Sequence, residues 1–91
     1  IEIIHVPGHS PGNLALYMHR HKAIIAGDTI FGDNERIIEA PPKKYCNDAD
    51  SAAKNLVILA EYDFDALLLS HGLNTYAGAK EKVMKLIESC V

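Results

Sequence analysis

The hydrophobic residues of this chain fall into short apolar runs separated by turn residues, a pattern typical of alternating strands and helices. Residues 1–6, 13–19 and 22–27 are predicted to be strands, with the last two joined as a hairpin through a polar tip around Arg20. A further strand is predicted at residues 66–70, which read ALLLS. Together these segments predict a small mixed sheet of about four strands.

Two amphipathic helices are predicted in the second half of the chain. The first begins at Asn47 or Asp48, either of which can cap it, and the second covers residues 76–90. Residues 28–47 are expected to be mostly loop, because a pair of consecutive prolines prevents a continuous helix there. The apolar positions predicted to face the core are Ala52, Leu56, Leu59 and Ala60 in the first helix and Tyr76, Ala79, Val83, Leu86, Ile87 and Cys90 in the second.

Two of the predicted strands are apolar at consecutive rather than alternate positions. The segments KAIIAG and ALLLS have the pattern of strands that are covered on both faces. Two helices of this length can cover one face of a small sheet, so the expected fold is α/β (or α+β), a single domain over residues 1–91 with both helices on one face. The second face should then pack against a missing half of the same protein, a second copy of the chain or a different subunit.

Charge and composition narrow the range of partners. The chain has 9 Lys+Arg against 12 Asp+Glu and no run of like charge, so neither nucleic acid nor a membrane surface is expected as a partner, and a small-molecule substrate fits better.

No apolar stretch reaches the ~20 residues of a membrane helix, and no secretory signal precedes the first strand. Cys46 and Cys90 lie far apart, which favours reduced thiols and a cytoplasmic location. Because Ile1 opens directly in a strand, we expect a processed N-terminus or a piece of a longer polypeptide.

Three segments each end an apolar run with a side chain that can bind a metal ion. His9 lies in PGHSPG, Asp28 in AGDTIF and His71 in LLLSHG. Imidazole nitrogens and carboxylate oxygens hold zinc and similar divalent ions in catalytic sites. In the first turn, Gly8 and Gly12 should allow a close backbone approach, while prolines stiffen the loop. Taken alone, His9 is better explained as a turn residue and Asp28 as a cap, and His71 could be an ordinary strand-end residue, but their joint occurrence favours metal ligation.

Other polar residues are weaker candidates. His19 and His21 form an H-x-H at the hairpin tip, but Lys, Ala and Ile follow in place of the required acid and histidine, so we expect both to face solvent. His5 is expected to support the site or to pack rather than to bind metal. The polar cluster Asp33–Arg36 has the character of a solvated loop that could border a substrate pocket, and Tyr45 is too isolated for a role to be assigned.

The three motifs together resemble the C-terminal half of a metallo-β-lactamase-fold hydrolase. HVPGHSPGNLALY is similar to the third metal motif of that family, AGDTIF to the fourth and LLLSHG to the fifth, in the same order. The resemblance implies half of a four-layer αββα sandwich with a dinuclear site at the edge where two halves meet. It implies that His9 completes the ligands of the first metal, that Asp28 bridges both metals and orients the nucleophile, and that His71 binds the second metal. Zinc is the expected ion, and iron and manganese accept the same ligands.

The remaining ligands of that family come from an H-x-H-x-D-H segment, which these 91 residues do not contain. The resemblance therefore implies a metal-dependent hydrolase that directs a metal-activated hydroxide at an ester, thioester or related bond, most like the thioesterase and glyoxalase-II-like branch, with an incomplete site in this chain alone. Two alternatives remain open. One is a non-catalytic metal-binding or interaction module. The other is one subunit of a split hydrolase, completed by a partner that carries H-x-H-x-D-H, with self-association as a related expectation.

Overall fold

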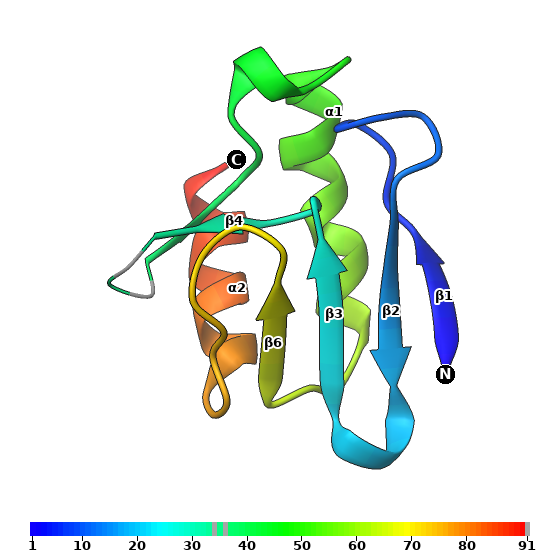
Figure 1. Cartoon of the computed structure of the whole chain (residues 1–91), viewed down its shortest axis with the longest axis vertical. Coiled ribbons are helices and arrows are strands. Elements are labelled where there is room, and N and C mark those ends of the chain that lie inside the picture. The colour runs from blue at the N-terminus through cyan, green and yellow to red at the C-terminus, as the bar shows by residue number, and fades with distance from the viewer. Residues whose placement is uncertain (34, 36, 91) are drawn as a thin grey trace.

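The main sheet has four strands in the order β1–β2–β3–β6 (Figure 1). The computed structural model describes residues 1–33, 35 and 37–90. β1, β2 and β3 pair antiparallel, whereas β3 and β6 pair parallel. The predicted mixed sheet and the β2–β3 hairpin are therefore confirmed. The strands are β1 (Glu2–His5), β2 (Leu14–Met18), β3 (Ala23–Gly27) and β6 (Ala66–Leu69).

Helices cover one face of this sheet, as predicted (Figure 1). α1 (Ala49–Lys54) continues directly as the 3₁₀ helix η3 (Asn55–Glu61), and α2 (Ala79–Ser89) follows β6. Asp48 caps α1, because its carboxylate accepts a hydrogen bond from the backbone N–H of Ser51 (3.1 Å). Hydrogen bonds from Ser51 to this carboxylate hold the pKa of Asp48 below its ordinary value.

The second helix begins later than the sequence predicts. α2 starts at Ala79 rather than at residue 76, and the Tyr76 side chain, which the helical spacing places on the inner face, is 70% exposed. The reason lies outside the helix. Asp65 accepts hydrogen bonds from the backbone N–H groups of Gly78 (2.8 Å, to the carboxylate) and Ala79 (3.1 Å, to the carbonyl), and these bonds hold the chain in a turn before the helix.

The segment between β3 and α1 is more ordered than the predicted loop. It includes a two-stranded antiparallel sheet, β4 (Phe31–Gly32) and β5 (Ile38–Glu39), and the 3₁₀ helix η2 (Lys43–Tyr45). Asp33 and Glu35, from the predicted polar cluster, lie in the connection between β4 and β5. The Asp33 carboxylate accepts hydrogen bonds from the backbone N–H groups of Glu35 (2.8 Å) and Ile37 (3.0 Å), whereas the other two members of the cluster, Asn34 and Arg36, lie outside the described residues.

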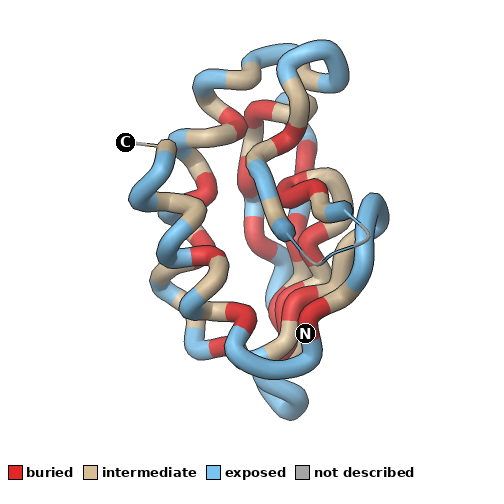
Figure 2. The backbone as a smooth tube through the Cα atoms, turned by 90° about the vertical axis from the view of Figure 1, so that its left-hand side faces the viewer, coloured by how far each residue is buried: buried red, intermediate tan, exposed pale blue. Residues whose placement is uncertain are grey.

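The core lies between the sheet and the helices. In Figure 2, which views the molecule from the side, buried stretches (red) lie in the interior between these two layers. Burial of each large aliphatic side chain there contributes about 1.5–3 kcal/mol. The large side chains that are fully buried are Val6, Ile24, Ile30 and Leu67 from the strands and the segments after them, and Leu56, Leu59 and Val83 from the helices.

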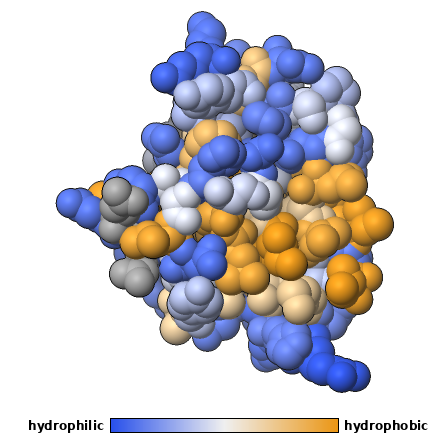
Figure 3. All heavy atoms as spheres, in the orientation of Figure 1, coloured by the Kyte–Doolittle hydropathy of each residue, from blue (hydrophilic) through white to orange (hydrophobic). Residues whose placement is uncertain are grey.

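The opposite face of the sheet carries an apolar row that the described part of the chain leaves open. The strand register aligns Ile3, Leu16, Ile25 and Leu68, one from each strand. Because successive side chains alternate between the faces of a sheet, these four share the face away from the helices. Figure 3 shows hydrophobic residues gathered on this face; Ile3 is 65% exposed, and the other three are partly buried. The row is the second apolar face predicted from the consecutive apolar positions.

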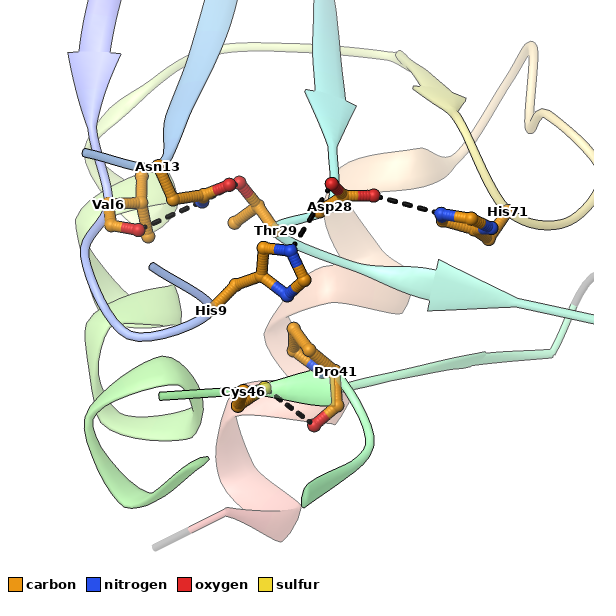
Figure 4. Close-up of polar contacts among 8 residues, drawn as sticks. All are labelled: Val6, His9, Asn13, Asp28, Thr29, Pro41, Cys46 and His71. Carbon is orange, nitrogen blue, oxygen red and sulfur yellow. Dashed lines mark hydrogen bonds and ion pairs between the residues drawn. The ribbon is translucent and has the colours of Figure 1, made fainter. Parts of the chain in front are cut away.

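The two cysteines are both free. Burial raises the pKa of the Cys46 thiol, whose sulfur lies 3.6 Å from the carbonyl oxygen of Pro41 (Figure 4). Unpaired thiols agree with the prediction from their spacing, while the cytoplasmic location stays a prediction. Among the described residues, none of the helices has the length and apolar character needed to cross a membrane.

Candidate metal centre

The three ligand candidates follow strands that end at the same edge of the sheet. β1 and β3 each run antiparallel to β2, and β6 runs parallel to β3, so β1, β3 and β6 all point the same way. Their carboxyl ends therefore meet at one edge. The segments that follow carry His9, Asp28 and His71, and Figure 4 shows their side chains turned toward one another.

Asp28 lies between the two histidines. Its Oδ2 atom is 3.3 Å from His9 Nε2, and its Oδ1 atom is 3.0 Å from His71 Nε2 (Figure 4). The two imidazoles thus approach different oxygens of one carboxylate. Within the described residues, no three His, Cys, Asp or Glu side chains are grouped as ligands of a single ion. The arrangement is a carboxylate shared by two histidines, not three ligands around one point.

Two aromatic residues complete the pocket in which these side chains lie. The pocket has a volume of about 310 Å³ and is lined by the three ligand candidates together with Phe31 and Tyr45. The Phe31 ring stacks on the His71 imidazole (centroids 4.6 Å apart, planes at 19°), and Tyr45 also stacks on Phe31 (5.9 Å, 19°). Phe31 therefore restricts rotation of the His71 ring, while the half-exposed Tyr45 forms part of the pocket wall.

Sequence reasoning did not identify these two aromatic residues. Phe31 belongs to the AGDTIF motif, and its place three residues after Asp28 is the signal that could have indicated a role. No spacing links Tyr45 to any of the ligand motifs, because it reaches the pocket through the β4–β5 connection and η2. Asp33 and Glu35, by contrast, are not among the residues that line this pocket.

The turn that carries His9 is held against both ends of α1. The carbonyl oxygen of Gly8 accepts a hydrogen bond from the backbone N–H of Asp48 (2.9 Å), and that of Pro7 accepts one from the Asn55 side-chain amide (2.8 Å). These bonds fix the backbone on the N-terminal side of His9. The position of the imidazole therefore depends on the packing of the helix as well as on the strands.

The two glycines of the His9 turn have different roles. Gly8 has a φ of +140°, and a Cβ atom there would lie 2.3 Å from the backbone of Ala52 in α1. Only glycine allows this approach, as predicted. A Cβ atom at Gly12 would meet no atom within 4 Å. The prediction of a close approach is therefore wrong for Gly12, because the second half of the turn faces open space.

A second close approach holds the turn that carries His71. Gly72 has a φ of +119°, and a Cβ atom there would lie 2.5 Å from the carbonyl carbon of Gly32 in β4. The Gly32 N–H donates a hydrogen bond to the carbonyl oxygen of His71 (2.7 Å). The short strand β4 thus braces the His71 turn, and it also places Phe31 beside the imidazole.

The donor atoms of these three side chains are of the types that bind divalent metals, while in the structure each imidazole contacts the carboxylate directly as an ion pair. Two imidazole nitrogens and a carboxylate are common zinc ligands, and bonds of about 2.0 Å place neighbouring ligand atoms of a tetrahedral site about 3.3 Å apart. The N–O separations of 3.3 Å at His9 and 3.0 Å at His71 are close to this spacing. His9 Nδ1 is buried and has no hydrogen-bond partner among the described residues, so the polar contact of this ring is made through Nε2, which faces Asp28.

Two of the remaining histidines lie apart from this centre, as predicted. His19 and His21 belong to the exposed 3₁₀ helix η1 (His19–His21) at the hairpin tip, which joins the end of β2 to the beginning of β3 and so lies at the opposite edge of the sheet. His5 Nε2 donates a hydrogen bond to the carbonyl oxygen of Pro11 (2.7 Å). His5 thereby supports the turn that carries His9.

Comparisons with known proteins agree with this architecture. The family model described as the metallo-beta-lactamase superfamily matches residues 1–71. The chain is 29% identical over 80 residues to the probable metallo-hydrolase YflN of Bacillus subtilis (strain 168), across 77% of this chain and 30% of that protein. Two solved structures share the fold over 97% of the chain. They are a metallo-beta-lactamase family protein from Thermus thermophilus (TM-score 0.68, 18% identity) and an archaeal metallo-beta-lactamase superfamily protein from Sulfolobus tokodaii (TM-score 0.70, 13% identity).

This chain belongs to the metallo-beta-lactamase superfamily. The resemblance carried by the three sequence motifs and the expected fold class, half of an αββα sandwich, are therefore confirmed. The chain spans 30% of the length of the Bacillus relative and 29% and 32% of the two structural relatives.

Proposed function

We propose that this chain supplies part of the active site of a metal-dependent hydrolase. The observation that carries the proposal is the position of Asp28, which presents one oxygen to each of two imidazoles at 3.0 and 3.3 Å. We propose that Asp28 bridges two metal ions, that His9 and His71 each bind one of them, and that zinc is the ion. When bound, such ions lower the pKa of a water molecule and supply hydroxide near neutral pH.

The residues of the pocket favour an ester or thioester as the substrate. None of the described residues that line the pocket is Lys or Arg, the side chains that commonly add to phosphate recognition. Phe31 and Tyr45 instead present aromatic surface beside the carboxylate of Asp28. These rings would exclude water from one side of the site and pack against an apolar group of the substrate.

The proposed function predicts how much metal the protein binds. Mixed with an N-terminal half that carries H-x-H-x-D-H, the chain is expected to bind two zinc ions, because that half supplies the remaining ligands. Alone, it should bind zinc weakly. Elemental analysis after gel filtration measures the zinc content of the chain alone and of the mixture. As a control, a His19→Ala variant should bind as much zinc as the wild type, because His19 lies at the opposite edge of the sheet. A single ion with or without the second half would favour the non-catalytic metal-binding module.

Hydrolysis by the same mixture tests the substrate class. A thioester and a phosphodiester assayed in parallel are expected to show turnover of the thioester only. Activity restored on mixing supports a hydrolase whose site is divided between two polypeptide segments. Two bound zinc ions without turnover of either substrate would contradict the proposed reaction, although not the proposed ligands.

We further propose that the apolar row on the open face of the sheet is an association surface. The complementary half would cover it in the complete protein, and a second copy of the chain would cover it otherwise. Sedimentation velocity of the chain alone is expected to show self-association, which Ile3→Lys should weaken by placing a charge in the row. Ile37→Lys is the matched control, since Ile37 is similarly exposed (62% against 65%) but precedes β5, outside the main sheet. A stable wild-type monomer would contradict this prediction.

A further inference from the structure

Asn13 joins the two segments that carry His9 and Asp28. It is 8% exposed and lies at the end of the His9 turn, directly before β2. Its side-chain amide donates one hydrogen bond to the carbonyl oxygen of Val6 (2.9 Å) and another to the hydroxyl oxygen of Thr29 (2.8 Å) (Figure 4). Val6 begins the segment that leads to His9, and Thr29 directly follows Asp28. A single buried side chain therefore connects the two ligand-bearing segments.

The hydrogen bonds around Asn13 form a closed set. The backbone N–H of Val6 donates to the carbonyl oxygen of Asn13 (3.0 Å), and the N–H of Asn13 donates to the carbonyl oxygen of Ser10 (3.2 Å). Thr29 is buried, and its own N–H donates to the carbonyl oxygen of Ala26 (2.9 Å). Displacement of either segment would leave a buried N–H of the Asn13 amide without an acceptor, which lowers the stability of the fold.

The two ligands themselves have few other polar anchors. Histidines that bind metal usually donate their second ring N–H to a carboxylate or carbonyl group, which fixes the ring. His9 Nδ1 has no such partner among the described residues. The separation between His9 and Asp28 must therefore be set by the backbone of their two segments, and Asn13 is the side chain that joins these segments.

We propose that Asn13 is a positioning residue that sets the distance between His9 and Asp28 and thereby the affinity of the site for its metal. The proposal rests on the function proposed above. Asn13 is not among the residues that line the pocket, so it acts through the two segments rather than as a ligand. This position needs a side chain with two hydrogen-bond donors, one for the Val6 carbonyl and one for the Thr29 hydroxyl. An amide supplies both, whereas serine offers one donor and an ionised aspartate offers none.

Zinc affinity of the chain mixed with the N-terminal half that carries H-x-H-x-D-H, measured by competition with a chromophoric chelator, tests the proposal. Thr29→Val, which removes the hydroxyl acceptor, and Asn13→Ala are each expected to weaken zinc binding about 10-fold, within the range for residues that orient metal ligands. Thr29→Ser retains the hydroxyl and should bind zinc like the wild type. The double variant should be no weaker than Asn13→Ala alone, since both changes break the same bond.

Hydrogen exchange in the metal-free chain supplies a readout that does not depend on zinc. In Asn13→Ala, the amides of Val6 and Thr29 should exchange faster, whereas those of Leu67 and Thr75, which bond to each other at the far side of β6, should be unchanged. Val83→Ala in the core of α2 is the stability control, because it should weaken the whole fold without acting on the two segments selectively.

The two readouts separate failure of this proposal from failure of the proposed function. If Asn13→Ala lowers zinc affinity no more than Val83→Ala does at equal loss of stability, or if its exchange rates rise uniformly along the chain, Asn13 has no specific positioning role. If the wild-type chain and its mixture with the second half bind no zinc, the proposed function fails. The exchange pattern would then still decide whether Asn13 holds the two segments together.

Discussion

Replacement of Asp28 by alanine is expected to remove metal binding at both histidines. Oδ2 of this carboxylate faces His9 and Oδ1 faces His71, so under the proposed function the single change would delete a ligand from both metal positions. The loss of zinc affinity should exceed the roughly 10–100-fold cost of losing a residue that only orients a ligand. Zinc content and chelator competition measure this loss, and thioester hydrolysis by the assembled protein should fall with it.

The matched control for this variant is Asp63→Ala. Asp63 is a more exposed aspartate that also forms an ion pair, with Lys22 Nζ at 3.3 Å, but it lies near the hairpin end of the sheet. The Asp63→Ala variant should therefore bind zinc like the wild type. His9→Ala and His71→Ala should each weaken one metal position and so have smaller effects than Asp28→Ala. If Asp28→Ala retained one tightly bound zinc ion, Asp28 would not be shared between two ions.

The second large effect is expected from Gly8→Ala, which should destabilise the fold by about 3 kcal/mol through strain at positive φ and overlap with α1. The new Cβ atom would lie 2.3 Å from the backbone of Ala52, which cannot move without shifting the helix. Gly12→Ala, in the same turn, should change stability by no more than about 1 kcal/mol, because its Cβ atom enters open space. Urea unfolding of the two variants measures the difference.

Zinc binding should follow the same order in these two variants. The strained backbone of Gly8→Ala adjoins His9, so the imidazole should shift and the affinity for zinc should fall, whereas Gly12→Ala should bind zinc like the wild type. Equal stability of the two variants would show that the His9 turn is not held against α1 in the way described. Loss of stability in Gly8→Ala with unchanged zinc affinity would show that the position of His9 does not depend on this contact.

The sequence predicted the fold best where a local pattern carries the information. The four strands, the hairpin and the Asp48 cap each depend on residues that are neighbours in the chain. The two departures from the prediction have different causes. Tyr76 lies outside α2 because Asp65, which is distant in the sequence, holds the turn before the helix. The strands β4 and β5 were not predicted because each has only two residues, too few to show an alternation of apolar and polar positions.

The sequence by itself determined the chemical character of this protein. The motifs around His9, Asp28 and His71 indicated the family, which is confirmed, and predicted the ligands, while the consecutive apolar positions in two strands indicated a sheet with two apolar faces. These features are readable because each is contained in a short segment of the chain. They establish which side chains are available, and not how those side chains are arranged.

Only the tertiary structure decided that the Asp28 carboxylate lies between two imidazoles and that Phe31 and Tyr45 complete the pocket. The order and direction of the strands bring the ends of β1, β3 and β6 to one edge of the sheet. Stacking of Tyr45 on Phe31 likewise depends on where β4 and η2 pack. Such arrangements arise from packing between distant segments, which no local sequence pattern encodes.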